Sequence, residues 1–248
     1  MGFPSPGESG DAVAGVARLG RSGQVAEKGK ADGAYDEIER MIIFQEITPG
    51  SLVSESMLTA STGFGRTPVR EALQRLAREG MVQIHPSKGV LVPAASVDTQ
   101  LRLLELRRVL EALAVELACG RAAGEHRREM AAMVDRLKHE EFTLGTYLET
   151  VKETHHLIVD AAANEYLADA LAPAQALSRR FWIAHMRDEA DQISRGSTLH
   201  GRILEAILAR DDSAARAASL ALNDYLVDFA YAVLGHLRPP RNKDSSAA

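Results

Sequence analysis

The stretch GRTPVREALQRLAREG, residues 65–80, decides the fold of the N-terminal half of the chain. Its apolar residues recur at i, i+3, i+4 and i+7, the spacing of a helix that buries one stripe, and they are Val69, Ala72, Leu73 and Leu76. Pro68 suits the first turn of such a helix, where its missing N–H needs no partner, and Gly80 suits its end. With the stripe turned to a core, the outer face carries Arg66, Thr67, Arg70 and Gln74.

The segments around this helix complete a small domain over residues 34–93. Residues 34–47 have helical spacing, and residues 54–62 form a helix of two turns that Ser54 can cap. After the helix of residues 66–79, MVQIHPSKGVLVP reads as two strands joined by a tight turn at Pro86–Gly89. Two helices, a turn, a third helix and a hairpin predict a winged helix-turn-helix.

The outer face of the third helix has the chemistry of a DNA-reading surface. Arginine can bind guanine O6 and N7 with two hydrogen bonds, and threonine can bond a phosphate or touch a thymine methyl. The exposed N-terminus of a helix also suits a phosphate. The alternative is a solvated face, since residues 34–93 carry six Lys and Arg against seven Asp and Glu. The hairpin favours DNA, because a wing tip with His85, Lys88 and Gly89 belongs with such a helix.

The rest of the chain predicts a mainly α protein with two tails. Residues 1–33 hold almost no large apolar residue, so we expect them to be disordered, and we expect residues 237–248 to be a C-terminal tail. Residues 98–236 have long helical patterns that predict an all-α bundle of about six helices. One expected buried stripe consists of Leu103, Leu106, Leu110, Leu113 and Leu117.

Composition excludes several classes of protein. The net charge of −5 means that any DNA-binding face must be local. The single cysteine, Cys119, cannot form an intramolecular disulfide, which fits a reducing cytoplasm. No apolar run approaches the roughly 20 residues that span a bilayer. We therefore expect a cytoplasmic protein with no membrane partner.

Residues 48–92 resemble the DNA-binding domain of the GntR family of bacterial transcription regulators, above all through RTPVREAL at 66–73. The resemblance implies that Arg66, Thr67 and Arg70 contact DNA and that the wing tip lies near a groove. One departure is Phe64–Gly65, where the family usually has Val–Ser. Segments 105–118, 155–167 and 199–216 are similar to the FCD ligand-binding domain of FadR-type members of this family.

Three residues are the expected effector-binding set of the helical domain: Arg107, His155 and His200. Arg107 either pairs with Glu111 one turn later or holds an effector carboxylate, and the resemblance favours the second reading because family effectors are often organic acids. His155 and His200 lie on apolar faces of separate helices. They are either ordinary core histidines or a pair that converges to bind a small acid or a metal.

The resemblance also bears on metal binding. Many FCD domains hold a divalent metal with an Asp one turn before the first His and a third His on the last helix. Here those positions carry Val151 and Leu222 or Asn223, so His155 and His200 are weak metal candidates. We expect no certain cofactor, and a divalent metal is possible but disfavoured.

The sequence thus predicts a regulator, and two other classes stay open. The prediction is a homodimer that binds an inverted repeat in double-stranded DNA, acts as a repressor, and is modulated by a small carboxylate-containing metabolite. One alternative is a helical metal-dependent enzyme or metal sensor that uses His155 and His200. The other is a structural helical dimer whose first domain binds protein.

Overall fold

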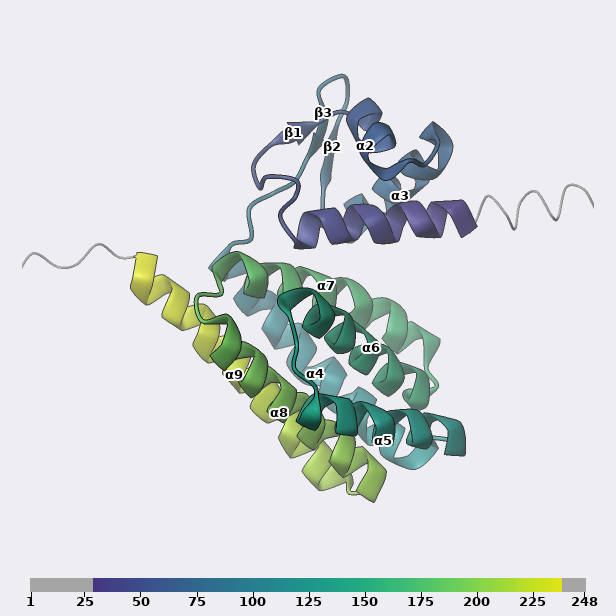
Figure 1. Ribbon diagram of the computed structural model, residues 1–248, viewed down its shortest axis with the longest axis vertical. Helices are drawn as coiled ribbons and strands as arrows, with labels where there is room; N and C mark the ends of the chain where they lie inside the picture. Colours follow the sequence, from purple (N-terminus) through teal and green to yellow (C-terminus); the bar gives the residue numbers. More distant parts are fainter. Residues whose placement is uncertain (1–28, 238–248) are drawn as a thin grey trace, which may run out of the picture. The chain divides into compact units, whose positions relative to one another are not determined.

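The computed structural model describes residues 29–237, and the chain divides into two compact units after Pro93 (Figure 1). The predicted tails lie outside the described residues except at their inner ends. There the predicted boundaries are wrong, because residues 29–33 belong to a helix of residues 29–43 and Leu237 ends the last helix. Within this helix, a Cβ at Gly33 would lie 2.9 Å from the Phe64 ring, so the absent side chain permits close packing.

The first unit is a winged helix-turn-helix with a sheet of three strands. After the helix of residues 29–43, the order is β1 (Leu52–Val53), α2 (Glu55–Thr62), α3 (Arg66–Arg78), β2 (Gln83–His85) and β3 (Gly89–Leu91). The strand order is β1-β3-β2 with antiparallel pairs, so the predicted hairpin is confirmed as β2 and β3, and β1 joins it as a third strand that was not predicted. The missed strand, β1, is held because Val53 is buried and pairs with Val90.

Local sequence signals account for most of this unit. The four stripe residues of α3 are at most 2% exposed, as predicted. Ser54 caps α2, because its Oγ accepts a hydrogen bond from the Met57 N–H at 3.1 Å. Gly80 follows α3 with a φ of 78°, a left-handed conformation that glycine adopts without a steric cost.

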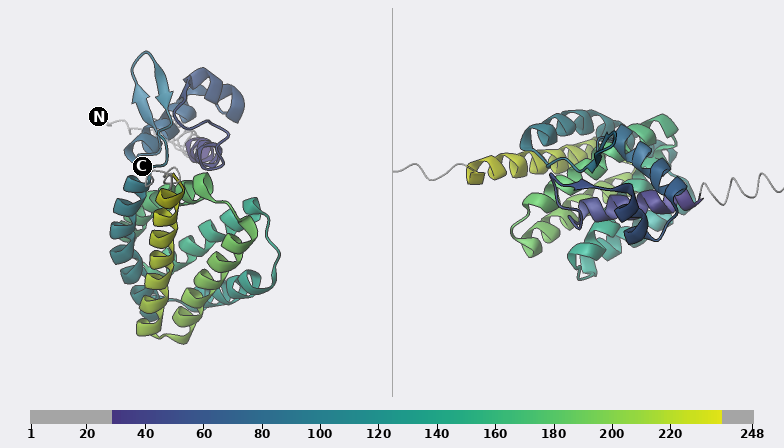
Figure 2. Two further views of the ribbon diagram at one scale, coloured as in Figure 1. Left: turned by 90° about the vertical axis from the view of Figure 1, so that its left-hand side faces the viewer. Right: turned by 90° about the horizontal axis from the view of Figure 1, so that it is seen from above.

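Six helices form the second unit up to residue 237, as the sequence predicts (Figure 2). They are α4 (Val97–Arg121), α5 (Gly124–His139), α6 (Leu144–Ala162), α7 (Glu165–His185), α8 (Glu189–Ala209) and α9 (Asp212–Leu237). Helix α4 is central, since α6, α7, α8 and α9 all contact it. Within residues 29–237, no helix has both the length and the apolar character needed to cross a membrane.

The leucine stripe of α4 is not the face that packs into its own bundle. Leu106 and Leu113 are 47% and 40% exposed, and Leu103, Leu110 and Leu117 are only half-buried, so the predicted burial is wrong. The buried residues of α4 are instead Val97, Gln100, Leu104, Arg107, Glu111, Ala112, Ala114, Val115, Ala118 and Cys119. Small residues and a paired Arg and Glu fill this face, because neighbouring helices pack close to α4 from several sides.

Candidate DNA-binding face and ligand pocket

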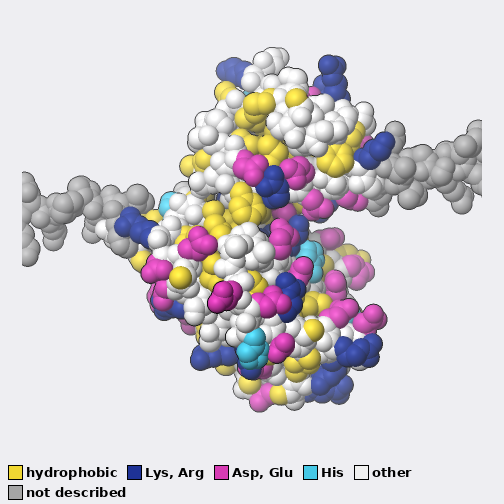
Figure 3. Space-filling model, in the orientation of Figure 1, with side chains coloured by type: hydrophobic (Ala, Val, Ile, Leu, Met, Phe, Trp, Pro, Cys, Tyr) yellow, Lys and Arg dark blue, Asp and Glu magenta, His cyan; other side chains and the backbone are white. Residues whose placement is uncertain are grey.

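The outer face of α3 presents the predicted DNA-contacting side chains to solvent. Arg66, Thr67, Arg70 and Gln74 are all exposed, opposite the buried stripe. Gly65 occupies the N-cap position and makes no side-chain cap, so the first N–H groups of α3 lack a local side-chain partner there. Basic and acidic side chains are interspersed over the side of the molecule that Figure 3 shows.

Arg70 has a partner that sequence reasoning missed. Its Nε donates to the Glu55 carboxylate at 2.7 Å, and the Arg70 side chain remains 68% exposed. Glu55 is the first residue of α2 and lies 15 positions away, so no helical spacing could indicate the pair. The carboxylate therefore competes with any anion that approaches Arg70.

The wing residues differ in their surroundings. Lys88 is exposed in the turn between β2 and β3, and His85 is half-buried at the end of β2. Gly89 has a φ of 115°, and a Cβ there would lie 2.6 Å from the Val53 carbonyl oxygen. The fold alone therefore requires glycine at position 89, and a DNA contact by Gly89 stays a prediction.

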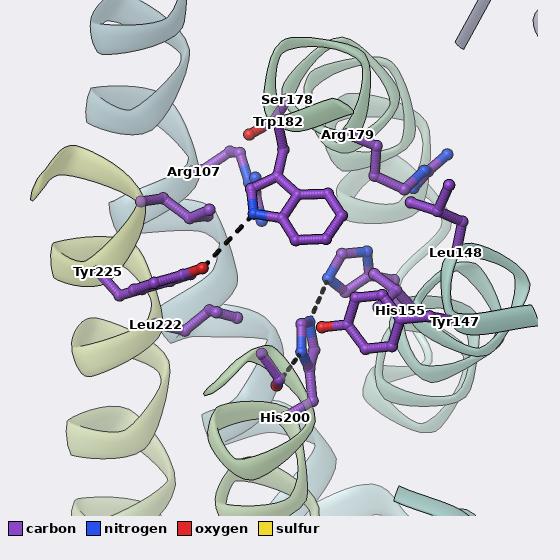
Figure 4. A pocket seen from close by; sticks show the side chains of 13 residues that line it. Arg107, Tyr147, Leu148, His155, Ser178, Arg179, Trp182, His200, Leu222 and Tyr225 are labelled. Atoms are coloured by element: carbon purple, nitrogen blue, oxygen red, sulfur yellow. Dashed lines mark hydrogen bonds between the residues drawn. The ribbon is translucent and has the colours of Figure 1, made fainter. Parts of the chain in front are cut away.

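A pocket in the second unit brings together Arg107, His155 and His200, the three predicted effector-binding residues (Figure 4). It contains about 450 Å³ of space between protein atoms, its opening to solvent included. Five helices supply its wall, which is largely apolar, and its other residues include Tyr147, Leu148, Val151, Trp182, Leu222, Tyr225 and Leu226. A concave apolar site with a few convergent polar groups is typical of small-molecule binding.

The two histidines contact one another inside this pocket. Their Nε2 atoms lie 3.4 Å apart, and Nδ1 of His200 lies 2.8 Å from the Gly196 carbonyl oxygen. Burial lowers the pKa of His155 well below its usual range, with further lowering by His200 and Arg107. Burial also lowers the pKa of His200, against the opposing effects of the Gly196 carbonyl and Glu111. Both imidazoles are therefore neutral near pH 7.

Arg107 forms the ion pair with Glu111 that was one of the two alternatives predicted for it. Its Nε and Nη2 both donate to Oε1 of Glu111, at 3.1 and 2.8 Å, and both side chains are at least nine-tenths buried. Oε1 of Glu111 also accepts from the Gln175 side chain at 3.2 Å. Arg107 thus lines the pocket with its charge already balanced by a buried carboxylate.

The donor set around the histidines does not fit a zinc ion. Val151 and Leu222 line the pocket where a ligand would be needed, and neither can bind a metal. The Asn223 side chain donates to the Leu104 carbonyl instead. Residues 29–237 contain no group of three or more His, Cys, Asp or Glu that could hold a metal. Two imidazoles alone fall short of the three or four protein ligands of zinc sites.

Aromatic residues complete the pocket, whereas the sequence favoured a core or interface role over a pocket role for Trp182 and did not place Tyr147 or Tyr225 there. Tyr147 and Trp182 lie with ring centroids 5.8 Å apart. The Tyr225 hydroxyl accepts from the Trp182 indole N–H at 3.5 Å and donates to the Gln192 side chain. A Cβ at Gly196 would overlap the Tyr147 hydroxyl, so this glycine lets the Tyr147 ring reach the pocket.

Comparison with known proteins agrees with both units. Residues 30–92 match the family described as "Bacterial regulatory proteins, gntR family", and residues 102–224 match the FCD domain. The chain is 33% identical over 180 residues to the Nta operon transcriptional regulator of Aminobacter aminovorans, covering 71% of this chain and 83% of that protein. It is 27% identical over 195 residues to the HTH-type transcriptional repressor GlaR of Escherichia coli, covering 75% and 88%.

Solved structures share the fold. McbR/YncC of E. coli has a TM-score of 0.69 at 18% identity, covering 82% of this chain and 97% of that one. A GntR regulator from Rhodococcus sp. RHA1, described as putative, has a TM-score of 0.61 at 21% identity, covering 85% and 100%. The sequence relatives, together with the winged helix-turn-helix, decide for a regulator against an enzyme. The chain belongs to the gntR family of bacterial transcription regulators, carries an FCD domain, and is a DNA-binding regulator.

Proposed function

We propose that the protein represses transcription by binding an inverted repeat as a homodimer, and that a small molecule in the pocket of the helical unit changes this binding. The exposed outer face of α3 is the observation that carries the proposal, since it aligns Arg66, Thr67 and Arg70 opposite a buried stripe. Each recognition helix enters one major groove, and Lys88 on the wing reaches the backbone or minor groove. Because the proposed partner is operator DNA, we propose that the protein acts in the cytoplasm, where the DNA lies.

The leucine stripe of α4 supports the dimer. Its residues alternate at spacings of three and four, which is the a/d repeat of helices that pack against a partner helix. Leu106, Val109 and Leu113 are 47%, 67% and 40% exposed, which is unusual for three large apolar residues so close together. The partner that we propose for this stripe is α4 of a second copy of the chain, because two identical stripes would cover each other in a symmetric dimer.

The pocket supports modulation by a small molecule. It is enclosed by five helices of the unit that also carries the leucine stripe. An organic acid is the effector class that Arg107 and the family resemblance favour, and its carboxylate would share the guanidinium with Glu111. A ligand changes DNA affinity only through its different affinities for the arrangements of the dimer. Release of the operator on ligand binding is the direction we propose.

Selection of genomic fragments by the full-length protein tests the DNA-binding proposal. We expect a shared inverted repeat at about 150 mM salt, where binding through phosphates alone is suppressed. Arg70→Ala should abolish this selection, and Arg128→Ala, which removes an exposed arginine of α5, should leave it unchanged. Unchanged selection by a folded Arg70→Ala variant would show that α3 does not read the DNA.

Sedimentation measurements test the dimer. The double variant Leu106→Glu and Leu113→Glu should be monomeric at concentrations where the parent protein is dimeric. Tyr166→Glu is the matched control, because Tyr166 is 79% exposed on α7 and lies outside the stripe. A folded double variant that remains a dimer would place the interface elsewhere.

A further inference from the structure

The hydrogen bonds of the two histidines fix where their protons lie. Nδ1 of His200 is 2.8 Å from the Gly196 carbonyl oxygen, and a carbonyl only accepts, so this nitrogen carries the proton. Nε2 of neutral His200 is therefore an acceptor. The 3.4 Å contact with Nε2 of His155 then requires His155 to donate from that atom. Nδ1 of His155 is left as an acceptor with an available lone pair.

This nitrogen of His155 has no hydrogen-bond partner among residues 29–237, and it is buried. The His155 side chain lines the pocket and is 7% exposed. In Figure 4 the second ring nitrogen of His155 is directed away from His200, toward the side of the pocket where Trp182 and Arg179 lie. A buried acceptor without a protein partner is costly, so a donor at this position, from a ligand or from an ordered water, would be stabilising.

The pocket wall around Nδ1 of His155 favours a ligand with an apolar part. The Tyr147 and Trp182 rings, 5.8 Å apart, lie beside it, with Leu148 and Val151 on α6. A carboxylate cannot satisfy Nδ1 of His155, because both groups only accept. A hydroxyl or an N–H group can.

We propose that this pocket binds, without a metal ion, a small molecule whose apolar part packs against Trp182 and Tyr147 and whose hydroxyl or N–H group donates to Nδ1 of His155. The inference deepens the proposed function by naming the chemistry of the effector. A carboxylate elsewhere in the same molecule is compatible with it, and a simple carboxylate without a donor is not.

The tautomer of His155 distinguishes this proposal from a metal site. A metal held between the two Nε2 atoms needs a lone pair on each, so His155 would carry its proton on Nδ1. The proposed arrangement places that proton on Nε2. Nitrogen-15 NMR of the full-length protein above pH 7, with His155 assigned through His155→Phe, measures this directly. Protonation on Nδ1, or a shift of both histidines on adding zinc, would overturn the proposal.

Trp182 gives a second readout, because it is the only tryptophan of the chain and lines the pocket. We use phenol as the probe, with anisole as the matched compound that lacks a donor. Phenol should change the Trp182 fluorescence with at least about tenfold higher affinity than anisole, as expected for one buried hydrogen bond. Equal binding of phenol and anisole to the unmodified protein would overturn the proposal.

Variants add a control for position. His155→Phe should remove the preference for phenol over anisole, and His156→Gln on the exposed side of α6 should retain it. A folded His155→Phe variant that retains the preference would contradict the assignment. The DNA selection separates the two proposals. Phenol preference in a protein that selects no DNA leaves the ligand inference standing and refutes the proposed function. DNA selection by a protein that shows no preference for phenol leaves the proposed function standing and refutes the ligand inference.

Discussion

Lowering the pH should destabilise the helical unit through His155 and His200. Burial depresses the pKa of both side chains in the folded protein, whereas in the unfolded chain they titrate near 6.5. The unfolded state therefore binds more protons as the pH falls below about 6.5, and the free energy of unfolding decreases. The contribution of these residues is fully present above that pH and is lost below it.

The size of the effect follows from the linkage relation. Each histidine that stays neutral in the folded protein lowers the free energy of unfolding by about 1.4 kcal/mol for each pH unit below about 6.5. His155 should give the full slope, because its pKa lies well below the ordinary value. His200 should give less, because the Gly196 carbonyl and Glu111 oppose the lowering of its pKa. Together they should contribute between about 1.4 and about 2.7 kcal/mol per pH unit.

Urea unfolding followed by Trp182 fluorescence measures this effect in the unit that contains the pocket. The free energy of unfolding is measured at about pH 7.5 and about pH 5.5 for the parent protein and for each variant. The difference between the two pH values is then compared between proteins, because carboxylates that titrate over the same range are present in all of them and their contributions cancel. His155→Phe should reduce the pH dependence by about 1.4 kcal/mol for each unit below about 6.5. His156→Gln should not reduce it. An unchanged dependence in His155→Phe would refute the buried, neutral state of His155.

Three further outcomes follow from the first unit. Glu55→Gln should raise operator affinity by up to about fivefold, because an exposed ion pair with Arg70 is worth at most about 1 kcal/mol; fluorescence anisotropy measures it, with Glu71→Gln as a control of equal charge. Gly65→Ser should raise the stability of this unit by about a few tenths of a kcal/mol in thermal unfolding, whereas Gly65→Ala should lower it. Gly89→Ala should cost more than about 1 kcal/mol, because of the positive φ and the Val53 carbonyl; a smaller loss would show that β1 can move away.

Local signals were sufficient to predict the recognition helix. The spacing of Val69, Ala72, Leu73 and Leu76 and the terminal Pro and Gly all lie within 16 residues, so the chain itself defines the helix and its buried side. Strand β1 could not be found in this way, because two residues carry no periodicity. Gly89, whose missing side chain leaves room for the β1 backbone, adds a signal that no spacing reveals.

The leucines of α4 show a different limit. Their spacing predicted an apolar stripe, and that stripe is present, but the sequence could not tell which partner it packs against. The own-bundle face of α4 holds Arg107 and Glu111, residues that a hydrophobic pattern places outside. They are buried because each neutralises the other at 2.8 Å, a pairing that depends on the rotamers and neighbours of both side chains.

Only part of the pocket could be predicted, because its wall also depends on which helices lie next to one another. His155 and His200 lie on apolar faces of α6 and α8, and the prediction that they converge was recoverable from that pattern and the family resemblance. The aromatic wall was not, since Tyr147 and Tyr225 come from helices far apart in the chain. Nor does any spacing reveal that Gly196 both orients His200 and gives Tyr147 its space.

Helix α4 connects the pocket with the stripe proposed as the dimer interface. Arg107 lines the pocket, and Leu106, the preceding residue, is 47% exposed on the stripe proposed as the interface. Leu106 and Arg107 are adjacent in α4, so a ligand that displaces Arg107 from Glu111 acts on the turn of helix that carries Leu106. A ligand can change the affinity of the dimer only if it binds two arrangements of the protein with different affinities. Ligand-dependent dimer affinity in the parent protein, lost in Glu111→Gln but retained in Glu116→Gln outside the pocket, would identify this turn as that contact. Coupling that survives Glu111→Gln would show that the ligand acts through another helix.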